Sequence, residues 1–449
     1  MTRDTRSPIF RQIFAAVAVN ILSISNGLSA SWTSVVENAI EKPNNPIRSE
    51  PVTKEEFTWV SAALYLGGFV GIFIWNNVAD KFGRKINGYA LALTQIFGWL
   101  GVIFSSSIIQ LTIARFVTGL GGAGIITCSQ LYINETANAK IKGPLCALLI
   151  IAMQIGYLFV TILGSILPYN IFNFACLSVP VVFVLLYFLL PESPLYFLMY
   201  QKPAEAEKAL LWFYYGNKYA VEEKMEALTQ SINENVKPPP LRDLIANEQI
   251  TKTSFTAIIL LAGHQLCGYA FISSYTVNIF QMSNTSISPN SSAIVVYVIQ
   301  FITACVMAYA GKYAPKRLVM VISYFAAGLS LACLSLFFFL KDTNDVSNFS
   351  WVPTLSLIIF IMCYSSGIGP VSYMLLAEMF PARLLNNVIC VGLTVSISLA
   401  FTTVKIFYFL QKTFSIHGTF LLYSLSNAVL TLFVLKFVKN STWKPAEGH

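Results

Sequence analysis

"SFTAIILLAGHQLCGYAFISSYTVNIF", residues 254–280, contains no acidic residue, lysine or arginine. A helix needs about 20 consecutive apolar residues to cross a bilayer, so this stretch predicts a transmembrane helix. It also carries polar side chains, among them His264, Gln265 and Tyr275. Because such groups are costly in lipid unless they face protein or a cavity, we expect one face of this helix to line a polar interior.

The rest of the chain repeats the apolar pattern. Of its 449 residues, 55% are hydrophobic and only 11% are charged, and the mean hydropathy is +0.64. Soluble domains carry about 25% charged residues, so a soluble fold is excluded. Twelve apolar runs lie near residues 10–32, 57–79, 87–107, 111–133, 145–167, 171–190, 254–280, 292–311, 318–340, 351–376, 388–411 and 416–438. The alternation of barrel strands is absent, and the sequence predicts an all-α membrane protein with twelve transmembrane helices.

The distribution of basic residues predicts the orientation. The loops on the side of both termini hold most of the lysines and arginines, whereas the other side has only Lys42, Arg48, Lys54, Lys341 and Lys412. The positive-inside rule therefore predicts cytoplasmic termini. The net charge of +8 follows from this bias, so no nucleic-acid partner is expected. The first run lacks a small-residue cleavage site and is interpreted as a permanent helix.

The cysteines indicate no covalent framework. All eight fall inside predicted spans, one in each of eight helices, so we expect no disulfide, metal site or cofactor. The outer loops do contain N-x-[ST] sequences, which are glycosylation candidates at Asn284, Asn290 and Asn348.

A long hydrophilic stretch divides the twelve spans into two sets of six. The predicted domains are an N-terminal six-helix bundle (1–190), a cytoplasmic helical linker (191–252), a C-terminal six-helix bundle (253–440) and a short cytoplasmic tail (441–449). A solute site is expected near the midplane, at the interface of the two halves. The chain has no P-loop, HExxH or nucleophile-elbow sequence, so we predict neither an ATP-driven pump nor an enzyme.

Four motifs carry a family resemblance. They are "NNVADKFGRK" (76–85), "ARFVTGLGGAGIITCSQLYINETANAKIKG" (114–143), "PESPLYFL" (191–198) and "GIGPVSYMLLAEMFP" (367–381). In order and position they resemble the signatures of the sugar porter family of the major facilitator superfamily, and within it the insect trehalose and hexose facilitators. The resemblance covers essentially the whole chain and implies the major facilitator fold, a carrier that works by alternating access.

The resemblance also implies a cytoplasmic charge network that stabilises one state of the carrier. Its members would be Asp80, Arg84, Glu135, Lys142, Glu192 and Glu378. The second half departs from the family pattern, because Lys312 stands where a carboxylate is expected and Leu385 where an arginine is expected.

The opening stretch resembles the family's QQxxGxN segment, with His264 at the first Gln and Ala270 at the Asn. Sugars are bound by several hydrogen-bonding side chains over an apolar floor. When the binding positions of the family are carried over to this sequence, the expected solute-binding residues are Gln265, His264, Tyr275, Gln300, Gln154, Ser365, Tyr373 and Ser396. Tyr275 falls on the position of an outer gate.

Three roles are open for His264: a neutral hydrogen-bonding group, a packed side chain or a proton carrier. Since we find no carboxylate at mid-depth in any predicted span, proton symport is the less favoured interpretation. We expect a monomeric uniporter for a small neutral sugar, a hexose or a disaccharide such as trehalose, in the lipid bilayer of the plasma membrane. Its uptake would be saturable and insensitive to a pH gradient. The alternatives are the same fold carrying a non-sugar solute, and a sensor that binds a solute without transporting it.

Overall fold

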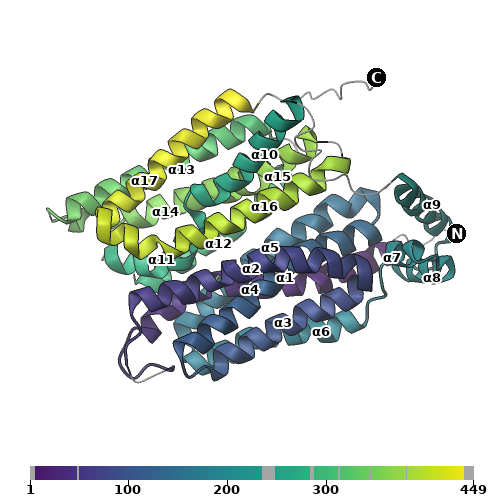
Figure 1. Ribbon diagram of the computed structural model, residues 1–449, viewed down its shortest axis with the longest axis horizontal. Helices are drawn as coiled ribbons and strands as arrows, with labels where there is room; N and C mark the ends of the chain where they lie inside the picture. The colour runs from purple at the N-terminus through teal and green to yellow at the C-terminus, as the bar shows by residue number, and fades with distance from the viewer. Residues whose placement is uncertain are drawn as a thin grey trace. The chain divides into compact units, whose positions relative to one another are not determined.

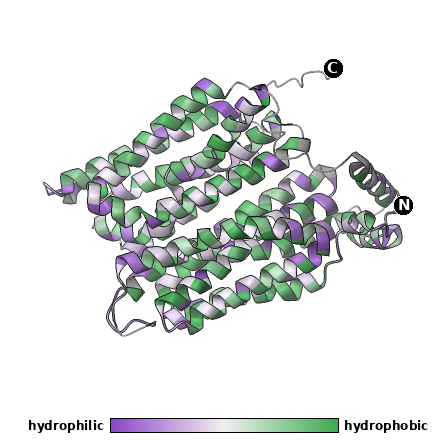
Figure 2. Ribbon diagram, in the orientation of Figure 1, coloured by the Kyte–Doolittle hydropathy of each residue, from purple (hydrophilic) through white to green (hydrophobic). Residues whose placement is uncertain are grey.

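The computed structural model describes residues 6–47, 50–234, 248–283, 288–311, 314–343, 345–380 and 382–438. Within these ranges the regular structure is helical and no strand occurs (Figure 1). In this described part of the chain, twelve helical segments are long and apolar enough to cross a membrane. Hydrophobic residues predominate along them (Figure 2). The predicted all-α membrane fold is confirmed.

The helices follow one another along the chain in three groups. The first group is α1 (Arg6–Ile40), α2 (Lys54–Phe82), α3 (Arg84–Phe104), α4 (Ile108–Thr136), α5 (Ala139–Ile166) and α6 (Tyr169–Phe188). The short helices α7 (Pro194–Met199), α8 (Pro203–Phe213) and α9 (Lys218–Glu234) come next. The last group is α10 (Glu248–Leu266), α11 (Tyr269–Ser283), α12 (Pro289–Ala310), α13 (Lys316–Lys341), the 3₁₀ turn η2 (Ser347–Phe349), α14 (Val352–Cys363), the π-helix η3 (Tyr364–Ile368), α15 (Gly369–Met379), α16 (Ala382–Lys405) and α17 (Phe407–Phe437).

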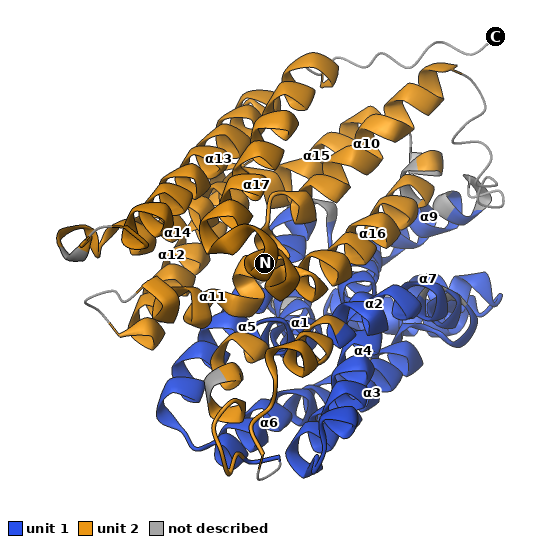
Figure 3. Cartoon of the chain, turned by 60° about the vertical axis from the view of Figure 1, so that its left-hand side comes forward, with its two compact units in different colours: residues 1–31, 46–49, 63–237 blue, residues 32–45, 50–62, 238–449 orange. Residues whose placement is uncertain are grey.

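Contacts group the chain into two compact units (Figure 3). Unit 1 holds residues 1–31, 46–49 and 63–237, and unit 2 holds residues 32–45, 50–62 and 238–449. The ends of α1 and α2 that flank their connecting loop thus belong to unit 2. This grouping follows contacts rather than chain order, so the predicted domain boundaries stay a prediction.

In unit 1, α2 and α4 approach each other closely at two glycines. A Cβ added to Gly119 would lie 1.9 Å from the carbonyl oxygen of Leu64, and one added to Gly67 would lie 2.0 Å from that of Phe116. Only glycine fits at such distances. Small residues that allow backbones to touch are a common means of holding helices together in lipid.

In unit 2, two spans are interrupted where the sequence predicts the solute site. The seventh span breaks between α10 and α11, where Gly268 has φ 102°. Asn427 donates to the carbonyl oxygen of Cys267 (3.0 Å) and Ser426 to that of Leu266 (2.8 Å), which satisfies carbonyls near the break. The tenth span contains the π-helix η3, a form often found at functional sites.

The first span is longer than predicted. The predicted run ends at residue 32, whereas α1 continues to Ile40 and the candidate span to Glu37. Polar residues near this end lower the hydropathy, but Ser34 and Glu37 are buried against other parts of unit 2. The extension therefore brings a carboxyl group into a buried position.

Candidate solute site and charge clusters

The residues predicted on the seventh, eighth, tenth and eleventh spans all belong to unit 2, and several of them are in contact there. His264 and Gln265 lie on the last turn of α10, just before the break. The side-chain amide of Gln265 contacts the hydroxyl of Ser396 on α16 (Nε2 to Oγ, 3.4 Å). Gln300 on α12 donates to the hydroxyl of Tyr269 on α11 (3.0 Å). Gln300 is thus linked through Tyr269 to Tyr364, the residue before Ser365. The predicted polar residues of these four spans, His264, Gln265, Gln300, Ser365 and Ser396, are called the polar wall.

Four atoms of the polar wall have no hydrogen-bond partner among the described residues. They are His264 Nε2, Gln265 Oε1, Gln300 Oε1 and Ser365 Oγ, and each is buried. The other ring nitrogen of His264 is engaged, because the imidazole hydrogen-bonds to the backbone of Ile368. A buried polar atom without a partner costs about 1–3 kcal/mol. A bound solute that offers several hydroxyl groups would remove this cost.

Aromatic rings adjoin the polar wall. Tyr269 and Tyr364 are stacked with their centroids 3.6 Å apart and an interplanar angle of 3°. The His264 ring lies edge-on to Tyr373, 5.4 Å between centroids. Tyr269 was not predicted as a site residue, because its role depends on the break that turns it towards Tyr364 and Gln300. Rings beside unpaired polar atoms suit a solute with both C–H faces and hydroxyls.

Other predicted site residues lie elsewhere. Tyr275 on α11 is buried, stacks on Phe407 (4.6 Å) and donates to the carbonyl oxygen of Val404 (3.4 Å). Gln154 is buried on α5 in unit 1, and its Oε1 has no partner among the described residues. Their predicted roles in gating and solute binding stay predictions.

The glycosylation candidates fall partly within the described chain. Asn348 is exposed in η2 and Asn290 is half-buried at the start of α12, while Asn284 lies outside the described residues.

Three of the six residues predicted for the charge network, Arg84, Glu135 and Glu192, meet in unit 1 around a buried ion pair. The guanidinium of Arg84 donates through Nε and Nη2 to the carboxylate of Glu135, with a shortest distance of 2.8 Å, and through Nη1 to the carbonyl oxygen of Ala79. Both partners of the ion pair are nearly inaccessible to water. Ser193 also donates to Glu135. A forked, multiply bonded pair is the arrangement in which two buried charges are tolerated.

Glu192 extends the network to the start of α3. Its carboxylate accepts from the backbone nitrogens of Arg84 (3.0 Å), Lys85 (2.9 Å) and Ser193 (2.7 Å). Burial raises the pKa of Glu192, and these hydrogen bonds oppose that rise. A carboxylate at the N-terminus of a helix also complements the helix dipole. Glu192 therefore joins the segment after α6 to α3.

Two predicted members do not join these contacts. Lys142 on α5 forms no ion pair among the described residues, and the side chain of Asp80 lies outside the described part. In unit 2, Glu378 pairs with Lys316 at the start of α13. The sequence motifs did not predict Lys316 as a partner of Glu378; Lys312, which stands where the family pattern has a carboxylate, lies outside the described residues. The sequence signal that could have indicated this partner is the position of Lys316, four residues beyond Lys312 in the same basic segment.

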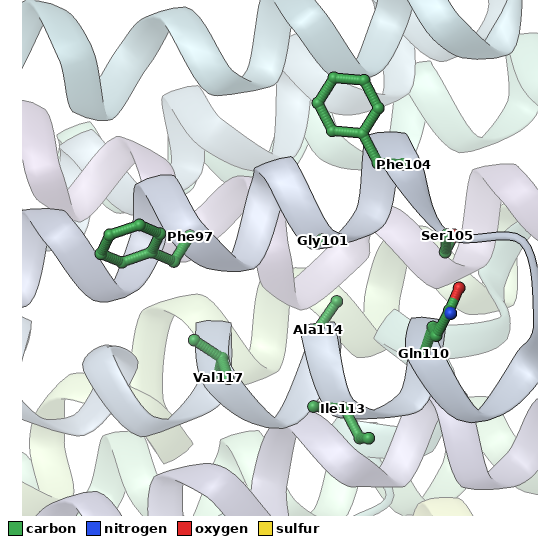
Figure 4. A pocket seen from close by; sticks show the side chains of 8 residues that line it. All are labelled: Phe97, Gly101, Phe104, Ser105, Gln110, Ile113, Ala114 and Val117. Carbon is green, nitrogen blue, oxygen red and sulfur yellow. The ribbon is translucent and has the colours of Figure 1, made fainter.

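A separate apolar pocket lies between α3 and α4 (Figure 4). It is lined by Phe97, Gly101, Phe104, Ser105, Gln110, Ile113, Ala114 and Val117. Phe97, Phe104 and Ile113 are exposed, so in a bilayer they face lipid. Because few polar groups line it, this pocket does not suit a polyhydroxylated solute.

Comparisons with known proteins agree with the motifs. The family model described as "Sugar (and other) transporter" matches residues 10–448. Facilitated trehalose transporter Tret1 of Polypedilum vanderplanki is 28% identical over 452 residues, which cover 99% of this chain and 89% of that protein. The protein of the same name from Anopheles gambiae is 27% identical over 99% of this chain, which spans 56% of that longer protein.

Solved structures show the same fold. The inward open conformation of the xylose transporter XylE from E. coli has a TM-score of 0.80 at 16% sequence identity, covering 96% of this chain and 98% of that chain. The family match extends over nearly the whole sequence. The chain therefore belongs to the sugar (and other) transporter family.

Proposed function

We propose that this protein is a facilitative uniporter that carries a small neutral sugar across a membrane by alternating access, and that it is not an enzyme. The observation that carries the proposal is the polar wall. Its buried atoms His264 Nε2, Gln265 Oε1 and Gln300 Oε1 have no hydrogen-bond partner among the described residues. The stacked rings of Tyr269 and Tyr364 adjoin it. Membership of the sugar (and other) transporter family supports the proposal, as does the name of the relatives, facilitated trehalose transporters.

The sugar is proposed to be a hexose or a disaccharide such as trehalose. Ala270 takes the place of the family's amide side chain and Tyr373 that of its tryptophan. These changes remove hydrogen-bonding capacity and aromatic area, which favours a substrate different from that of typical members. For the same reason the second candidate is a non-sugar solute carried by the same fold.

The cellular setting is proposed on the sequence. The basic loops support cytoplasmic termini, and we propose the plasma membrane, a monomeric state and glycosylation at Asn290 or Asn348. The two six-helix bundles, 1–190 and 253–440, are proposed to be the bodies that move relative to each other.

A solute panel tests the proposal. Purified protein in liposomes is expected to take up labelled glucose saturably, and an excess of unlabelled trehalose or glucose is expected to compete. Neutral non-sugar solutes of similar size should not compete, because they lack an array of hydroxyls. Competition by non-sugars alone would favour the second candidate, and binding without flux would show a sensor.

A further inference from the structure

Glu37 is a buried carboxyl group that the solute site does not use. It lies near the end of α1, in the part that belongs to unit 2, and its relative exposure is 0%. One carboxyl oxygen accepts a hydrogen bond from the hydroxyl of Tyr408 on α17. The other, Oε2, is buried with no partner among the described residues.

Titratable groups face this carboxyl group from several helices. Glu41, just beyond α1, is half-buried, and burial raises its pKa while Lys54 on α2 opposes the rise. The ammonium of Lys54 lies 5.2 Å from the ring centroid of Tyr408, and the ring of Tyr275 on α11 lies 5.5 Å from it. None of the ion pairs found among the described residues includes Glu37.

A second contact holds the neighbouring end of α2. Lys405, the last residue of α16, donates to the hydroxyl of Thr58 (2.7 Å), and its ammonium lies 4.2 Å from the ring centroid of Trp59. Both contacts lie within unit 2. They join the ends of α1 and α2 to α16 and α17. Separation of these ends of α1 and α2 from α16 and α17 would have to break both contacts.

The protonation state of Glu37 decides how easily the first contact breaks. An ionised carboxylate away from water needs a cation or several donors, and Glu37 has one phenol. A protonated carboxyl group is tolerated there at much lower cost. Ionisation therefore favours separation of α1 from α17, which lets water reach the carboxylate.

We propose that Glu37 is a proton-binding residue of the outer gate, protonated while the end of α1 packs against Tyr408 and ionised when the gate opens. The proton comes from the outer water and returns to it, so gating consumes no proton gradient. External pH would change the rate of transport, contrary to the expectation from the sequence that uptake is insensitive to a pH gradient, but it would not change the final distribution of solute. The gating role rests on the proposed transport function, whereas proton binding by Glu37 does not.

Proton binding is tested without transport. Dicyclohexylcarbodiimide reacts with protonated carboxyl groups in apolar surroundings, and peptide mass spectrometry locates the adduct. In the full chain in liposomes, modification of Glu37 is expected at acid pH and to disappear as the pH rises between about 4 and about 9, the range in which protein carboxyl groups titrate. Modification that does not change with pH, or none at any pH, overturns the proposal.

Gating is tested by equilibrium exchange of labelled glucose, with the same pH on both sides of the membrane. The wild-type exchange rate is expected to rise at least about threefold with pH as the open population grows, and Glu37→Gln to abolish the dependence. Tyr408→Phe, which keeps the ring but removes the donor, should shift the profile. Glu205→Gln, which removes an exposed carboxyl group from α8 in unit 1, should leave it in place. A profile unchanged in Glu37→Gln contradicts gating. Absence of exchange in the wild type, with normal labelling of Glu37, refutes the transport function and not the proton site.

Discussion

Replacement of Arg84 by alanine is expected to lower the stability of the protein by about 3–5 kcal/mol, because it leaves the Glu135 carboxylate buried without its cation. The carboxylate would keep only the hydrogen bond from Ser193, and the carbonyl oxygen of Ala79 would lose its donor. The measurement is the fraction of protein that stays monodisperse in detergent after heating, over a series of temperatures.

Two variants in the same region serve as controls for Arg84→Ala. Lys81→Ala removes an exposed positive charge from the last turn of α2 and should change stability by less than about 0.5 kcal/mol. Arg84→Lys keeps the charge but loses the fork that reaches both carboxylate oxygens, so an intermediate loss is expected. Equal thermal stability of Arg84→Ala and Lys81→Ala would contradict the account of the ion pair.

Replacement of Gln265 by alanine is expected to raise the half-saturation concentration for sugar uptake about tenfold or more. The reason is that Gln265 Oε1 is buried and unpaired among the described residues, so a solute hydroxyl would supply its partner. One such hydrogen bond contributes about 1.4 kcal/mol, which corresponds to a factor of about ten in affinity. Initial rates of uptake into proteoliposomes over a range of sugar concentrations give this quantity.

The matched control for Gln265 lies on the same helix. Gln249, in the first turn of α10, has an exposed side chain, and Gln249→Ala should leave the half-saturation concentration unchanged. Gln265→Glu is a further test, because a charge at the polar wall should lower uptake while keeping the size of the side chain. Unaltered uptake kinetics in Gln265→Ala would remove this residue from the solute site.

The sequence predicted the helices well, because lipid imposes a length and a composition on every span. The family resemblance also implied that Arg84, Glu135 and Glu192 belong to one cluster, and contacts in unit 1 bring these three residues together. Both Gln265 and Ser396 were predicted as solute-binding residues from their positions in the family pattern, and their side chains are in contact.

What the sequence could not predict depends on tertiary packing. Glu37 lies beyond the predicted end of the first span, so the sequence did not indicate that it is buried. In the fold it is buried and contacts Tyr408, which is far away in the sequence. Tyr269 stacks on Tyr364 because the helix is interrupted beside it at Gly268. The pairing of Lys316 with Glu378 joins the start of α13 to α15, which no sequence motif predicted. In each case the contact depends on a residue far away in the sequence, and the fold decides which residue that is.

The central claim is that the protein equilibrates a sugar across the membrane without using a gradient. It is tested most directly by the final distribution of labelled glucose in proteoliposomes, measured with and without an inward proton gradient. The account predicts equal concentrations inside and outside in both conditions, reached saturably and only when the protein is present. Accumulation of glucose inside above the outer concentration, driven by the proton gradient, would contradict it.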